Sequence, residues 1–248
     1  MIFRSKSKVV RALLFANIAV FVFVSIFYLP FSGHYGMAKV FYNFGLVPAA
    51  FWSGALWQPL TSLFLHGGLL HLAMNMIALW SLGAMIELMM GQKNFMRLYF
   101  VSGLTGAIFV VLFQAGSTIP TVGASGAVVG LLGALAILNP NASLLVFFFP
   151  VKARNAAIGL GIISLVSALA FENSQISHLG HLGGLIGGFL YTLALSKSQQ
   201  SHSYDHHIDH DFERTSRWAR SADGDTIRPR QKILVYDPVT GRFYYELR

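Results

Sequence analysis

The sequence predicts an all-α polytopic membrane protein with six transmembrane helices, both termini in the cytoplasm and a small cytoplasmic C-terminal tail. Three observations lead to this fold class. Hydrophobic residues make up 54% of the 248 residues and charged residues only 11%, whereas a soluble domain carries about a quarter charged residues. Apolar stretches of roughly 20 residues, the length that spans a bilayer, recur along the chain. The cations between these stretches fall almost entirely on one side of the expected membrane.

Six spans are expected. The first ends before Pro30 and is longer than the apolar part of a signal peptide, so we interpret it as a retained span. A polar and aromatic loop of about thirty residues follows, whose rings suit the headgroup layer. The segment Leu144–Phe149 is too short to cross and is interpreted as a loop that dips into the surface. The spans are Ala12–Leu29, Leu63–Ile86, Phe95–Ala115, Val122–Leu138, Ala156–Phe171 and Ser177–Leu195.

The loop cations orient these spans. Residues 1–196 contain nine Lys or Arg and only two acids, Glu87 and Glu172. Eight of the nine cations lie in the N-terminal segment or after the second and fourth spans, and only Lys39 lies in an opposite loop. Because positively charged loops stay in the cytoplasm, we expect a multi-pass protein of the cell or inner membrane with both termini in the cytoplasm. The same rule explains the positive charge, so we expect no nucleic-acid partner. The chain has no cysteine, which excludes disulfides and thiolate metal sites.

Three regions follow from these patterns: a basic cytoplasmic N-terminus (1–11), a six-helix membrane core (12–196) and a polar cytoplasmic tail (197–248). The tail contains a cluster of four histidines, His202, His206, His207 and His210. Near its end, two alternating runs surround the segment 237–241, which is the pattern of a β-hairpin.

Polar residues in three of the spans are candidates for chemistry. Ser125 stands in Gly123-Ala124-Ser125-Gly126, where the glycines leave its hydroxyl uncrowded. At 1.5 Å per residue, Ser125 and His181 both lie about 21 Å above the cytoplasmic boundary. That depth is about 10 Å below the outer surface of a hydrocarbon core of about 30 Å, and His71 is slightly shallower. The matched depth indicates that these side chains meet, although each alone is more often interhelical glue.

A serine hydroxyl reacts only when a base takes its proton. We therefore predict a catalytic dyad of Ser125 and His181, with His178 as the alternative base at a shallower depth. Neither acid of the membrane core is well placed as a third member. His71 and Asn75 share one helical face and could donate hydrogen bonds to an oxyanion, together with the backbone N–H of Ser125.

Glycines at four-residue intervals predict that the fourth and sixth spans approach closely, because small residues let helix backbones meet inside a membrane. The fourth span has Gly126 and Gly130, and the sixth has Gly180, Gly184 and Gly188.

These motifs resemble those of the rhomboid intramembrane serine proteases. The segment 123–126 is similar to the GxSG motif, His71-Leu72-Ala73-Met74-Asn75 to HxxxN, and His181-Leu182-Gly183-Gly184 to HxxG, in the same order over about residues 10–196. The resemblance implies cleavage of transmembrane protein substrates near their outer ends, within the lipid bilayer and with neither cofactor nor metal. It implies Ser125 as nucleophile, His181 as base, and His71, Asn75 and Gly123 at the oxyanion and substrate-binding part of the site. It indicates no oligomeric state.

Two positions depart from the family pattern. Family members often have Trp-Arg in the first loop, where this chain has Trp57-Gln58. Many have an aromatic residue four positions after the serine, stacked on the catalytic histidine, where this chain has Val129. Another group must therefore orient His181.

Two alternatives stay open. A polytopic transporter or metal-handling membrane protein would use the histidines of the core, namely His66, His71, His178 and His181. The shortage of carboxylates for ion coupling speaks against it, and it leaves Gly-Ala-Ser-Gly unexplained. An inactive rhomboid-like binder of membrane proteins would usually lack the serine or the histidine, and both are present.

Overall fold

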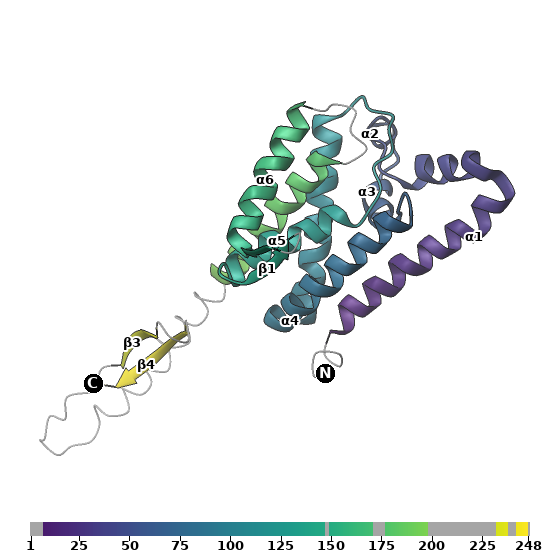
Figure 1. Cartoon of the computed structure of the whole chain (residues 1–248). Coiled ribbons are helices and arrows are strands. Elements are labelled where there is room, and N and C mark those ends of the chain that lie inside the picture. Colours follow the sequence, from purple (N-terminus) through teal and green to yellow (C-terminus); the bar gives the residue numbers. More distant parts are fainter. Residues whose placement is uncertain (1–6, 147–148, 171–176, 198–231, 238–241, 248) are drawn as a thin grey trace, which may run out of the picture. The chain divides into compact units, whose positions relative to one another are not determined.

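The computed structural model describes residues 7–146, 149–170, 177–197, 232–237 and 242–247 (Figure 1). The chain divides into two compact units, Met1–Gln199 and Gln200–Arg248. The first unit contains the helices and the second a short hairpin, and each is described by itself.

Four helical segments among the described residues are long and apolar enough to cross a membrane. Together they make the chain an integral membrane protein. A shorter apolar helix, α5 (Ser125–Leu138), has 14 residues. The four segments are Lys8–Phe27, Leu69–Phe113, Ala153–Ala170 and His178–Lys197.

Helix α1 (Lys8–Phe44) continues past Pro30, where the sequence analysis expected the helix to end, although the part of it that could span a membrane, Lys8–Phe27, does end before this proline. The helix continues through this proline and bends before its C-terminal part (Figure 1). A proline inside a helix removes one hydrogen bond and can kink the helix instead of ending it. The end comes at Gly45, whose N–H donates to the carbonyl of Phe41 and whose backbone is extended.

The expected loop after the first span is partly helical, which is a second correction. Short helices α2 (Pro48–Trp52) and α3 (Gln58–Thr61) occupy it, followed by the 3-10 turn η2 (Ser62–Phe64). Both helices have proline in their first turn, where the missing N–H costs no hydrogen bond. Trp52 and Trp57 remain largely exposed, as expected of rings at the headgroup layer.

Helix α4 (Leu69–Phe113) joins the second and third expected spans. Gly91, with φ 78° and ψ 163°, interrupts the helical backbone inside it. This left-handed conformation is one that glycine adopts without steric cost, so the chain can turn between segments 69–90 and 92–113. The start at Leu69 corrects the expected start at Leu63, because η2 and two glycines precede it.

Helix α5 lies in the centre of the unit. Much of it is buried against α4, and α6 (Ala153–Ala170) also contacts it. The largest cluster of buried apolar side chains joins α1, α4 and α5, with Leu79, Phe95, Tyr99, Leu131 and Leu135 fully buried.

The close approach predicted from the glycine spacing is confirmed. A methyl group added at Gly184 would overlap the carbonyl group of Gly126, and one at Gly188 would overlap that of Gly130. An added methyl at Gly126 would lie 3.2 Å from the carbonyl oxygen of Gly180. The backbones of α5 and the His178–Lys197 helix therefore touch with no side chain between them.

Two antiparallel hairpins complete the fold. β1 (Ser143–Val146) pairs with β2 (Phe149–Lys152), so the segment expected to be a surface-dipping loop is a hairpin. In the second unit, β3 (Lys232–Asp237) pairs with β4 (Arg242–Leu247), which confirms the two strands expected near the C-terminus. The turn residues 238–241 and the histidine cluster of the tail lie outside the described residues.

Candidate active site

Ser125 is the first residue of α5, and its position follows from the two residues before it. Gly123 has φ 128°, a conformation that favours glycine, so the chain cannot be helical there. Ala124 is fully buried, and its carbonyl accepts the first hydrogen bond of the helix, from the N–H of Val128. The serine therefore stands where an irregular segment enters the helix, and its own N–H belongs to the first turn, whose N–H groups have no partner within the helix.

The side chain of His181, 56 positions later in the sequence, contacts this serine. Its Nε2 lies 2.9 Å from the Oγ of Ser125, which is hydrogen-bond distance. His181 is in the first turn of the His178–Lys197 helix, where Ser177 fixes the backbone. The Ser177 Oγ accepts from the N–H of Gly180 at 3.2 Å, and the Ser177 carbonyl accepts from the N–H of His181 at 3.0 Å. Val129 is only partly buried, and the contact with the Ser125 Oγ holds the Nε2 side of the imidazole.

His71 lies on the other side of Gly123. A methyl group added at Gly123 would be 2.8 Å from both Cε1 and Nε2 of the His71 ring and 3.7 Å from the Ser125 Oγ. The imidazole thus packs directly on the backbone beside the serine, where only glycine leaves room. The other ring nitrogen, Nδ1, accepts a long hydrogen bond of 3.4 Å from the N–H of Gly67.

Asn75 lies one turn further along α4 and is buried. Its Nδ2 donates to the carbonyl of His71 at 2.9 Å, so its amide is bonded to its own helix. Because an amide nitrogen carries two N–H groups, a second donor is left over. The structure therefore brings the His71 ring close to the serine. The side chain of Asn75 bonds its own helix, one turn further along.

His66 is a neighbour of the site that the sequence analysis assigned only to the metal-handling alternative. Its ring packs edge to face on that of His71, with centroids 5.1 Å apart and an interplanar angle of 64°. The side chain is 2% exposed. Only the four residues 67–70 separate these histidines, and this short spacing is the sequence signal that could have paired them.

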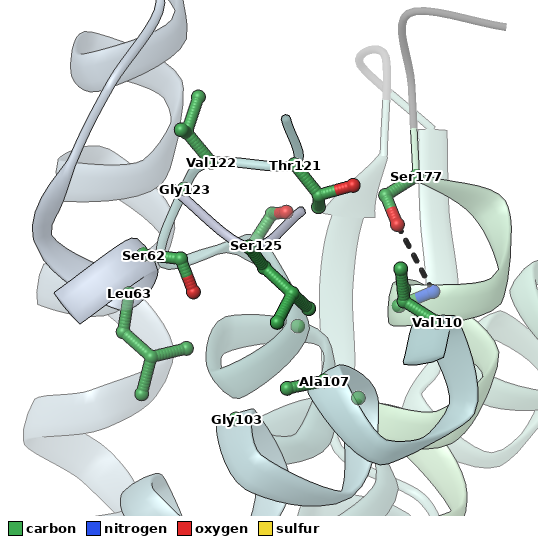
Figure 2. A pocket seen from close by; sticks show the side chains of 14 residues that line it. Ser62, Leu63, Gly103, Ala107, Val110, Thr121, Val122, Gly123, Ser125 and Ser177 are labelled. Carbon is green, nitrogen blue, oxygen red and sulfur yellow. Dashed lines mark hydrogen bonds between the residues drawn. The ribbon is translucent and has the colours of Figure 1, made fainter. Parts of the chain in front are cut away.

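A small pocket of about 30 Å³ opens beside Ser125. Figure 2 shows the serine between the segment 121–123 and residues of α4, with Ser177 across the pocket. The residues on α4 are mostly small, so the pocket has room for one or two water molecules or a small side chain. The α4 residues are Gly103, Gly106, Ala107 and Val110.

The backbone of Gly123 is held by a residue that the sequence analysis did not single out. Its N–H donates to the carbonyl of Ser62 at 2.9 Å. This N–H is therefore occupied and does not point into the pocket as a free donor. Within the described part of the chain, no group of three or more His, Asp or Glu side chains lies close enough to hold a metal ion.

The fold and the site together define an integral membrane protein with a serine–histidine pair held between apolar helices. The chain belongs to the rhomboid family: the model of the Rhomboid domain matches residues 53–198. This match confirms the resemblance of the three motifs.

Curated relatives carry the family name. The chain is 41% identical over 145 residues to "Rhomboid protease GluP" of Bacillus subtilis, covering 57% of this chain and 26% of that protein. It is 36% identical over 142 residues to "Rhomboid protein 1, mitochondrial" of Saccharomyces cerevisiae, covering 55% of this chain and 41% of that protein. A third relative, "Putative rhomboid protease YdcA" of Bacillus subtilis, is 30% identical over 167 residues, covering 64% of this chain and 75% of that protein.

Proposed function

We propose that the protein is an intramembrane serine endopeptidase that cleaves transmembrane substrates near the outer membrane face through a dyad of Ser125 and His181. The single observation that carries this proposal is the 2.9 Å contact between the His181 Nε2 and the Ser125 Oγ. A base within hydrogen-bond reach is what a serine needs to become a nucleophile. Membership of a family whose relatives are named proteases supports the same reaction.

The chemistry follows the order of acyl transfer. The Oγ of Ser125 attacks the scissile carbonyl carbon while its proton passes to the Nε2 of His181. The tetrahedral intermediate collapses, the C–N bond breaks, and the imidazolium gives the proton to the leaving nitrogen. Water then attacks the ester carbonyl, giving its proton to His181, and the acid product leaves as the Ser125 hydroxyl is restored.

The oxyanion needs donors aimed at the reacting carbonyl oxygen. The N–H of Ser125, in the first turn of α5, is one because no intrahelical carbonyl claims it. The imidazole of His71, packed against Gly123, is a second. Asn75 has one amide N–H left for a third contact after bonding the His71 carbonyl. Gly123 contributes space and pocket wall, since its own N–H is bonded to Ser62.

The proposed topology has six crossings with both termini in the cytoplasm. The interruption at Gly91 supports counting α4 as two crossings, and α5 supplies another within the protein interior. The cation distribution supports the orientation. In this topology residues 12–196 form the protease core and residues 197–248 a cytoplasmic tail. The partners are transmembrane protein substrates and the lipid bilayer.

The test is labelling of purified protein in detergent with a serine-directed fluorophosphonate, together with cleavage of a model transmembrane substrate. Wild type is expected to react in both assays. Ser125→Ala is expected to react in neither while its expression and thermal unfolding stay near normal. Substantial cleavage by folded Ser125→Ala protein would rule out the mechanism. Stoichiometric bound zinc, with activity lost to EDTA, would instead favour a metal-handling protein.

A further inference from the structure

The C-terminal end of α1 is capped by side chains of another helix. The last carbonyls of a helix have no partner within it and must find donors elsewhere. Here three consecutive carbonyls find them on α3 and the residue before it. Gln58 Nε2 donates to Tyr42 at 2.9 Å, Trp57 Nε1 to Asn43 at 2.8 Å, and Thr61 Oγ1 to Phe44 at 2.6 Å.

Gln58 differs from the other two because its second partner lies beyond the end of α1, whereas the second partner of Thr61 is the carbonyl of Trp57. The Gln58 Oε1 accepts from the backbone N–H of Val47 at 2.9 Å, and the side chain is 1% exposed. The two contacts fix the orientation of the amide, since the Val47 N–H needs an acceptor and the Tyr42 carbonyl needs a donor. One neutral side chain therefore connects the end of α1 to the segment after it.

That segment pairs with the chain that enters the candidate active site. The N–H of Leu46 donates to the carbonyl of Thr121 and the N–H of Thr121 donates to the carbonyl of Leu46, both at 2.8 Å. Thr121 is two residues before Gly123, which packs against His71. Leu46 and Thr121 both line the pocket beside Ser125. A continuous path of hydrogen bonds and backbone thus leads from Gln58 to the pocket wall.

We propose that Gln58 is a positioning residue: through Val47 and the Leu46–Thr121 pair it holds the segment 121–123 against His71 and Ser125. Its effect on catalysis rests on the proposed function. The residue type follows from the two contacts. An amide offers a donor and an acceptor, whereas the arginine often found here in rhomboids offers donors only and could not accept from Val47. In this chain, therefore, the Trp57-Gln58 departure is compatible with an ordered loop because it uses a different set of bonds.

Three variants of α3 separate positioning from stability. Gln58→Met keeps the shape of the side chain and loses both hydrogen bonds. Gln58→Glu keeps an acceptor for Val47 and loses the amide donor. Thr61→Val is the matched control, because it uncaps the same end of α1 but has no bond to the segment 46–47. Each full-length protein is purified in detergent, and its unfolding temperature is measured first.

Two readouts are then taken well below the unfolding temperatures. Hydrogen exchange is followed in peptides that contain the amides of Leu46 and Thr121, and the rate of fluorophosphonate labelling is measured at Ser125. Gln58→Met is expected to exchange these two amides faster and to label at least about tenfold more slowly, because misplaced groups near a reacting centre lose rate steeply. Gln58→Glu is expected to recover both readouts only in part, because it keeps the acceptor for Val47 but places a buried carboxylate oxygen beside the carbonyl of Tyr42. Thr61→Val is expected to unfold at a lower temperature and to match wild type in both readouts.

The outcomes decide the proposal. Unchanged exchange at Leu46 and Thr121 in Gln58→Met would overturn it. The proposal would also be overturned if Thr61→Val lost as much labelling as Gln58→Met, because the loss would then come from a general loosening of α3. If Gln58→Met does not fold, the exchange and labelling rates of Gln58→Glu are compared with those of Thr61→Val, and equal rates in the two variants would overturn the proposal. The exchange readout needs no catalysis, so it judges Gln58 even if wild type fails to label, and that failure would count against the proposed function alone.

Discussion

The carboxylate of Glu87, on α4, accepts a hydrogen bond of 2.9 Å from the backbone N–H of Val10 in the first turn of α1. Its other oxygen accepts from the N–H of Val9 at 3.1 Å, and the side chain is buried. The first N–H groups of a helix lack internal partners and attract a negative group. Glu87, one of the two acids of the membrane core, therefore caps the start of α1. It lies far along α4 from His71, so its burial is explained without a catalytic role.

Removing this cap should lower stability and spare the chemistry. Glu87→Ala leaves two buried N–H groups without an acceptor, so we expect the free energy of unfolding to fall by about 1–3 kcal/mol. Unfolding in detergent by heat or denaturant measures this loss. Glu87→Gln, which keeps one oxygen acceptor, should lose less. Equal stability of wild type and Glu87→Ala would show that water or another group caps α1.

The two histidines of the last helix should behave differently. His181→Ala removes the nitrogen 2.9 Å from the Ser125 Oγ, so we expect cleavage and fluorophosphonate labelling to fall below detection. His178→Ala, one turn earlier, is the control and should keep most of both. Rates for the two variants are compared after each is shown to unfold near the wild-type temperature. The reverse pattern would mean that His178 supplies the base.

Replacing either proposed oxyanion donor should leave residual turnover. Loss of one such donor costs on the order of 10²–10³ in rate in a soluble serine protease, so His71→Ala should lower kcat by about that factor yet stay above Ser125→Ala. Asn75→Ala should lower kcat by a smaller factor, because one of the two amide N–H groups of Asn75 already bonds the His71 carbonyl and only the other is left for the oxyanion. Steady-state kinetics with and without added zinc measure both. Restoration of activity by zinc would point to a metal site.

A matched control exists for Asn75. Asn94, also on α4, donates to the carbonyl four residues earlier, that of Met90, at 3.1 Å. Asn94→Ala therefore removes the same kind of bond away from the site and should leave kcat unchanged. A comparable loss of kcat in both variants would assign the effect of Asn75→Ala to the helix instead of the oxyanion.

Gly123 should tolerate no side chain. An alanine there meets the His71 ring at 2.8 Å and must adopt φ near 128°, a strain of roughly 1–3 kcal/mol. Gly123→Ala should lower both the unfolding temperature and the labelling rate. Gly116→Ala is the control, since an added methyl there has no neighbour within 4 Å. Wild-type labelling by Gly123→Ala would show that the ring can move aside freely.

Counting residues predicted one contact of the candidate site. Ser125 and His181 are 56 positions apart, yet the constant rise of a helix predicts a similar depth for both in the expected topology. Periodic glycines predicted the contact between their helices for the same reason, since packing inside a membrane depends on local residue size.

Local rules were less successful where tertiary contacts decide. Pro30 did not end α1, because a proline breaks one hydrogen bond and the rest of the helix is held by its surroundings. The segment after α1 was expected to be a loop, since no periodic pattern marks α2 or α3. These helices are only 5 and 4 residues long, and the bond from Thr61 to the end of α1 joins residues 17 positions apart. The bond from Asn75 to its own helix also lies beyond spacing arguments, which give a face and not a partner.

The contact between Gly126 and Gly184 has a mechanical consequence. Tilting is one way in which membrane helices respond to bilayers of different thickness. Where two backbones touch without intervening side chains, neither helix can tilt or slide without carrying the other. Ser125 and His181 sit within one turn of that contact on their respective helices. We therefore expect the distance between Ser125 and His181 to depend less on bilayer thickness than distances between helices separated by side chains.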